Sequence, residues 1–173
     1  MSAPTPEPRS NFWSLLRSVF FSALFLALQM WYLPRWMGLH GSWRASEQEP
    51  MRWLGLIPLL VGAVISLQCM FRFGTEGRGT PAPFDPPRQL VLRGLYRRVR
   101  NPMYWGLAFL LAGETVLFAD FNIRVLYYAV GLALIVHLFV LLYEEPTLRS
   151  KFGAEYEEYC RKVPRWLGWN VRI

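Results

Sequence analysis

Long apolar runs dominate the pattern of hydrophobic and polar positions and predict helices that cross a membrane. Four runs reach or approach the ~20 apolar residues that a helix needs to span the hydrocarbon layer, namely residues 12–31, 53–70, 102–118 and 123–143. Polar or helix-breaking residues interrupt the first three runs, and Glu114 is the most disruptive of them. The pattern predicts an all-α integral membrane protein with about four transmembrane helices.

The first run has two interpretations. A basic start followed by an apolar stretch is also typical of a cleaved signal peptide, but no small-residue cleavage site follows Met30. We therefore expect a retained first helix. Residues 1–10, which contain three prolines, are expected to be disordered. Residues 11–173 are expected to form a single domain.

The basic residues are distributed unevenly between the two sides of this predicted bundle. If there are four spans, all but four of the 19 lysines and arginines lie on the side that holds both termini and the loop between the second and third spans. Cytoplasmic loops carry such an excess. The sequence predicts a multi-pass protein with both termini in the cytoplasm.

Composition narrows the class of partner. Hydrophobic residues make up 53% of the chain and charged residues only 18%, and the net charge is +7. Membrane topology and anionic lipid head groups account for this charge better than nucleic acid does. The two cysteines, Cys69 and Cys160, are expected to be free thiols, and no cysteine–histidine cluster indicates a metal. The expected partners are the bilayer and an apolar ligand.

Two adjacent carboxylates, Glu144 and Glu145, follow the last apolar run. Adjacent ionised groups repel each other, and desolvation adds to the cost where a helix leaves the membrane. A cationic ligand would explain them better than a solubilising role. The arginine-rich loop 72–101 and the C-terminal stretch 144–173 are predicted to lie on the same side, so they can form a cytoplasmic cap over the bundle.

Two motifs in this half of the chain carry a family resemblance. The first is RQLVLRGLYRRVRNPMYWG, residues 88–106, and the second is a glutamate pair followed by FG-x-x-Y-x-x-Y and VPRW. Together they resemble the membrane-embedded methyltransferases of the isoprenylcysteine carboxyl methyltransferase and phospholipid methyltransferase superfamily. The two motifs cover roughly the C-terminal half of the chain, in the order that the family has.

The resemblance implies an S-adenosylmethionine-dependent methyl transfer to a lipidic or small apolar acceptor. The methionyl carboxylate would take N–H groups near Pro102, where a helix begins, and a glutamate would take the methionyl ammonium. Carried over onto this sequence, the cofactor-binding residues are Arg88, Gln89, Leu90, Val91, Tyr96, Asn101, Pro102, Met103, Tyr104, Glu144 and Glu145.

The chain departs from the family pattern at two positions. Asn101 stands where the motif usually has a histidine, although a backbone contact would survive that change. Val140 stands where the isoprenylcysteine enzymes have an arginine that is thought to hold the substrate carboxylate. A valine cannot bind a carboxylate, so we expect weak activity on prenylcysteine unless another group, such as Arg165, substitutes.

The candidate catalytic residues are His137, Arg165 and Glu114. His137 is the titratable group of the last span, although a lone histidine on an apolar helix is more often a packed residue. Glu114 is an intramembrane carboxylate that either pairs inside the bundle or lies on the substrate path. Two other functions stay open: an NADPH-dependent sterol-type reductase, because such enzymes share part of the first motif, and a non-catalytic membrane scaffold.

Overall fold

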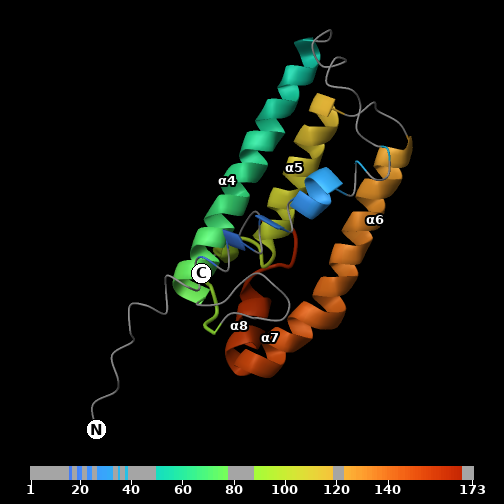
Figure 1. The fold of residues 1–173 in the computed structure, drawn as a ribbon. Helices are drawn as coiled ribbons and strands as arrows, with labels where there is room; N and C mark the ends of the chain where they lie inside the picture. Colours follow the sequence, from blue (N-terminus) through green and yellow to red (C-terminus); the bar gives the residue numbers. More distant parts are fainter. Residues whose placement is uncertain are drawn as a thin grey trace.

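A computed structural model describes residues 50–77, 88–118 and 123–168 continuously, together with separate positions between 16 and 38. This described part is helical and contains no strand. Three long helical rods, α4, α5 and α6, form the body of the molecule, and α7 and α8 lie at one end of it (Figure 1). The predicted all-helical class is confirmed.

The first long rod is one uninterrupted helix of 28 residues, Pro50–Gly77. It consists of a 3-10 turn, η2 (Pro50–Gly55), the α-helix α4 (Leu56–Arg72) and a π-helical turn, η3 (Phe73–Gly77). The helix therefore continues beyond the predicted limits of 53–70 at both ends. Pro58 lies in the first turn of α4, directly after the 3-10 turn η2 passes into the α-helix.

The second rod, α5 (Pro102–Phe118), has the bounds that the sequence predicts. It packs against α4 at very short range through small residues on both helices. A Cβ atom on Gly62 would lie 2.6 Å from the Leu110 backbone nitrogen, and one on Gly113 would lie 2.6 Å from that of Leu59. Small residues at such crossings let helices in a bilayer pack backbone to backbone. This packing makes α4 and α5 a closely packed pair.

The third rod, Ile123–Phe152, is a helix of 30 residues. Its parts are α6 (Ile123–Phe139), a π-helical turn, η5 (Val140–Glu144), and α7 (Glu145–Phe152). The helix therefore does not end at the glutamate pair. In the π turn the Glu145 N–H donates to the Val140 carbonyl, and this wider turn lets the helix pass Pro146 without a break.

A sharp turn then reverses the chain. Gly153 has φ +52°, a conformation that favours glycine, and it separates α7 from α8 (Ala154–Lys162). The shorter described elements are the π turn η1 (Ala27–Tyr32) and the 3-10 turn η4 (Gly94–Arg97) in the central loop.

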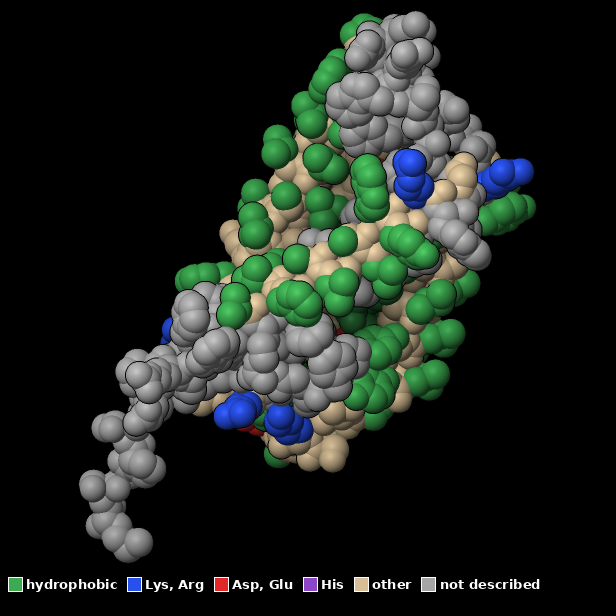
Figure 2. All heavy atoms as spheres, viewed as in Figure 1, with side chains coloured by type: hydrophobic (Ala, Val, Ile, Leu, Met, Phe, Trp, Pro, Cys, Tyr) green, Lys and Arg blue, Asp and Glu red, His purple; other side chains and the backbone are tan. Residues whose placement is uncertain are grey.

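The outer faces of the long helices expose large apolar side chains. Ile57, Leu60 and Leu67 of α4 are 63%, 62% and 62% exposed, and Leu134 and Ile135 of α6 are 57% and 66% exposed. In the view of Figure 2, apolar side chains cover the length of the rods while lysines and arginines lie toward the ends. Such faces suit lipid rather than water.

Two described helices, Pro50–Gly77 and Ile123–Phe152, are long and apolar enough to cross a membrane. The predicted disordered N-terminus, about half of the predicted first span and residues 119–122, between the last two predicted spans, lie outside the described residues. The four-span topology and its cytoplasmic termini stay predictions.

Candidate active site between the central loop and the C-terminal segment

Hydrogen bonds join the end of the central loop, the loop 72–101 that precedes α5, to the tail, the described residues 163–168 that follow α8. The Arg100 backbone N–H donates to the Pro164 carbonyl at 2.9 Å, and the Asn101 side-chain amide donates to the Arg165 carbonyl at 3.2 Å. Asn101 is itself buried. An amide at this motif position therefore holds the backbone of the tail, which explains what Asn101 does in place of a histidine.

A second connection runs between Tyr159 of α8 and Tyr96 of η4. The Tyr159 hydroxyl donates to the Tyr96 carbonyl at 2.7 Å. Burial raises the pKa of both phenols, and the Cys69 thiol beside Tyr96 adds to its shift, so both stay protonated. Tyr96 packs with Val91 and Cys69 in one apolar cluster. Its ring is therefore part of the core, and it fixes the central loop on α4.

Glu145 is surrounded by arginines. Arg165 donates two hydrogen bonds to its carboxylate, at 2.7 and 2.9 Å, and Arg100 Nη1 lies 3.0 Å from the same group. The Glu145 side chain is only 5% exposed. Its hydrogen bonds raise the pKa of Arg165, which stays charged. Glu145 therefore joins α7, the central loop and the tail through a compensated ion-pair cluster.

Glu144 has a different environment, although it is the adjacent residue. The Tyr104 hydroxyl donates to its Oε2 atom at 2.9 Å. Among the described residues, no lysine or arginine lies within ion-pair distance of this carboxylate. Glu144 is half-buried. It is therefore a partly desolvated carboxyl group with no cationic partner among the described residues, an environment that suits a cationic ligand.

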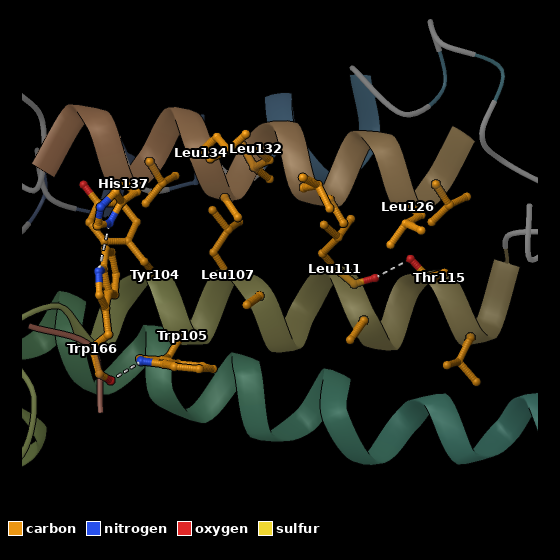
Figure 3. A pocket seen from close by; sticks show the side chains of 18 residues that line it. Tyr104, Trp105, Leu107, Leu111, Thr115, Leu126, Leu132, Leu134, His137 and Trp166 are labelled. Atoms are coloured by element: carbon orange, nitrogen blue, oxygen red, sulfur yellow. Dashed lines mark hydrogen bonds between the residues drawn. The ribbon is translucent and has the colours of Figure 1, made fainter. Parts of the chain in front are cut away.

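An apolar cavity of about 810 Å³ lies between α5 and α6. Its lining runs from Tyr104 to Val116 on α5, which corresponds to about 18 Å of helix. Figure 3 shows the leucines of both helices facing each other along this length. Leu126 and Val130, which line the cavity from α6, are 56% and 49% exposed, so the cavity is open on this side.

Polar atoms gather at one end of this cavity. Trp166, from the tail, donates its indole N–H to His137 Nδ1 at 3.1 Å, and its carbonyl accepts from the Trp105 indole at 2.7 Å. The Tyr104 and Trp166 ring centroids are 6.1 Å apart. Figure 3 shows Tyr104, His137 and Trp166 together at this end. Because Tyr104 also donates to Glu144, the carboxylate of Glu144 and the apolar cavity adjoin each other.

The predicted cofactor residues differ in how they present their side chains. Arg88 and Gln89 are exposed, and their backbone N–H groups both donate to the Gly77 carbonyl. Side chains that are partly exposed belong to Leu90, Met103, Tyr104 and Glu144. Buried side chains belong to Val91, Tyr96, Asn101, Pro102 and Glu145. The buried set can meet a ligand through backbone groups at most, so Tyr104 and Glu144 are the strongest side-chain candidates.

The three candidate catalytic residues do not lie together in one site. His137 lines the cavity, whereas Arg165 is bound to Glu145. Glu114 is ten residues after Tyr104 on α5, about 15 Å along the helix, and it is not among the cavity-lining residues. The sequence reasoning did not identify Trp166 or Arg100 as site residues. The VPRW motif that contains Trp166 was the signal that could have indicated it.

Comparison with known proteins identifies the family of this chain. Residues 50–155 match the sequence profile of phospholipid methyltransferases. The chain belongs to the phospholipid methyltransferase family. The matched region of this family member starts with η2 and α4 and extends into α8, so it includes the Tyr104–Glu144 contact.

Two curated relatives come from Oryza sativa, subspecies indica and japonica, and each is named a probable protein-S-isoprenylcysteine O-methyltransferase. Each is 30% identical over 118 residues, which is 64% of this chain and 58% of the relative. The aligned region thus spans little more than half of each relative's length. No solved structure matches the chain significantly.

Proposed function

We propose that this member of the phospholipid methyltransferase family transfers the methyl group of S-adenosylmethionine to a lipidic or small apolar acceptor. The observation that carries the proposal is the carboxylate of Glu144, which has no cationic partner among the described residues, beside one end of an apolar cavity. A methyltransfer site for a lipid needs both a polar cofactor subsite and an apolar acceptor subsite, and the two must adjoin.

The residues present fit the cofactor. Glu144 is a half-buried carboxylate held by a neutral phenol, so it can bind the methionyl ammonium with a charge-assisted hydrogen bond. The exposed Arg88 and the partly exposed Leu90 and Met103 provide further surface on the same motif. S-adenosylmethionine, when bound, supplies an activated methyl group on a sulfonium. The protein then has mainly to align the acceptor with that group and to exclude water.

The structure supports a lipidic acceptor for two reasons. The cavity lining is almost entirely aliphatic and aromatic, and its length of about 18 Å is comparable to the hydrocarbon thickness of one leaflet, roughly 15 Å. Its exposed side, at Leu126 and Val130, belongs to a helix whose neighbouring faces suit lipid. An apolar chain can therefore enter laterally from a bilayer while the head group stays at the Tyr104 end.

The structure argues against an acceptor whose head group is a carboxylate. Val140 is fully buried in η5, so it offers no contact to a ligand. Arg165 and Arg100 are both engaged by Glu145. With neither arginine free, an anionic head would carry an uncompensated desolvation cost, and a neutral or zwitterionic head is favoured.

The test is a methylation screen with labelled S-adenosylmethionine and purified protein in lipid nanodiscs. Acceptors would include phospholipids, prenylcysteine and apolar thiols. We expect transfer to at least one neutral or zwitterionic acceptor and its loss in Glu144→Gln. Binding of a reduced nicotinamide with no binding of S-adenosylmethionine would instead support the reductase alternative, which the family match does not favour. Binding of neither would support a scaffold.

A further inference from the structure

Trp166 links three elements at the polar end of the cavity. Its indole N–H donates to His137 of α6, its carbonyl accepts from Trp105 of α5, and its ring lies against Tyr104. The His137 and Trp166 ring centroids are 5.9 Å apart. This single side chain of the tail therefore closes one end of the cavity and holds the imidazole in a fixed orientation (Figure 3).

The direction of the hydrogen bond determines the protonation of His137. An indole nitrogen can only donate, so His137 Nδ1 must be the acceptor and carries a lone pair. A neutral imidazole with an unprotonated Nδ1 carries its proton on Nε2. Among the described residues, His137 Nε2 has no hydrogen-bond partner, and the side chain is partly exposed and lines the cavity.

We propose that Trp166 is a positioning residue that fixes His137 as a hydrogen-bond donor toward the head group of the lipid in the cavity. This inference rests on the proposed function and adds the chemistry of the head group to it. With Nε2 protonated, His137 does not remove a proton from the lipid. It donates a hydrogen bond to an uncharged oxygen, such as a carbonyl or ester oxygen. It disfavours a head group that has hydrogen-bond donors but no acceptor.

The rest of the cavity makes this contact selective. Its other lining residues are aliphatic or aromatic apart from Thr115, whose hydroxyl already donates to the Leu111 carbonyl. A head group without an acceptor oxygen would leave the Nε2–H without a partner once water is displaced. Head-group selection would therefore depend on one histidine, oriented from outside α6 by the tail.

The first test reads the tautomer directly. The chain has two histidines, so nitrogen-15 NMR of histidine-labelled protein gives two imidazoles, and His137→Gln assigns them. We expect His137 in the wild type to show an unprotonated Nδ1 and a protonated Nε2 at neutral pH. Trp166→Phe should give a mixture of tautomers, because the donor is lost while the ring remains. A protonated Nδ1 in the wild type would overturn the proposal.

The second test measures binding of two matched amphiphiles, N,N-dimethyldodecanamide and protonated N,N-dimethyldodecylamine, in the Glu144→Gln background, where no carboxylate attracts the ammonium. The amide should bind more tightly. His137→Leu should weaken amide binding about three- to tenfold, the size of one neutral hydrogen bond. His137→Gln, which keeps an N–H donor, should retain it. Equal binding of both probes, or equal loss in both variants, would refute the donor role.

Neither test depends on methyl transfer. Absent methylation with the expected tautomer and probe binding would remove the proposed function and leave His137 as the donor of a lipid-binding site. Methylation with the opposite tautomer would remove only this inference.

Discussion

The two adjacent glutamates should respond differently to the same substitution. In Glu144→Gln the carboxylate loses its charge but keeps its shape, and the Tyr104 hydroxyl can still donate to the amide oxygen. No ion pair with a described residue is broken. Folding should therefore be nearly unaffected. Affinity for S-adenosylmethionine should fall, because a charge-assisted contact to an ammonium is worth about 1.5–3 kcal/mol, or roughly ten- to hundredfold.

Glu145→Gln should instead destabilise the fold. The substitution leaves Arg165 and Arg100, whose side chains are 29% and 11% exposed, without their carboxylate. Breaking a fully buried pair costs roughly 3–5 kcal/mol. Because Arg165 is partly exposed to solvent, we expect about 2–4 kcal/mol here. The tail should then detach from α7, and cofactor binding should weaken as a secondary consequence.

The assay measures both variants in the same detergent by two methods: titration with S-adenosylmethionine and thermal unfolding followed by circular dichroism. Glu144→Gln should change affinity without changing the unfolding temperature, and Glu145→Gln should lower the unfolding temperature. Each variant serves as the control for the other, since the residues are adjacent and the chemical change is identical. Unchanged cofactor binding in Glu144→Gln would refute the assignment of this carboxylate to the cofactor.

Three further predictions concern packing, the cavity and the head group. Gly62→Ala should lower stability by about 1–3 kcal/mol in thermal unfolding, because its Cβ would lie 2.6 Å from a backbone nitrogen of α5, whereas Gly131→Ala, with nothing within 4 Å, should not. Ala129→Leu should reduce methylation of long-chain but not short-chain acceptors, because Ala129 lines the cavity about 12 Å before His137. Gly131→Leu is the control. Equal effects of the two substitutions would argue against an acceptor cavity. Wild-type protein should methylate prenylcysteine free acid poorly in the labelled assay, because the buried Val140 cannot bind the substrate carboxylate. Efficient transfer would mean that an arginine leaves Glu145 to bind this carboxylate.

Helix positions were largely predictable because they depend on local sequence. The run 102–118 became α5 with the same limits, since an apolar stretch that follows a proline defines both its start and its composition. The predicted end of the last helix was less accurate. Its apolar run ends at Tyr143, but the helix continues to Phe152 through a π turn. A π turn depends on tertiary packing around Val140, which the local pattern does not specify.

The division of roles between Glu144 and Glu145 could not be predicted from their own position. Both follow the same apolar run, and a helix turns by about 100° per residue, so adjacent side chains face different neighbours. Arg165, which lies 20 residues further along the chain, decides which carboxylate is neutralised. The sequence predicted that the two carboxylates bind a cationic ligand. Only the fold shows that arginines already neutralise Glu145.

The segment after α8 connects the two halves of the candidate site. Arg165 reaches Glu145 on α7, and the next residue, Trp166, reaches His137 on α6 and closes one end of the cavity. The carbonyls of both residues accept hydrogen bonds from the start of α5 and the residue before it, through Trp105 and Asn101. Displacing this short segment would therefore release the ion-pair cluster beside the free carboxylate and the end wall of the apolar cavity together. A site assembled in this way can align a polar methyl donor with an apolar methyl acceptor only while the tail is in place. The VPRW motif therefore has a physical role in the proposed methyl transfer.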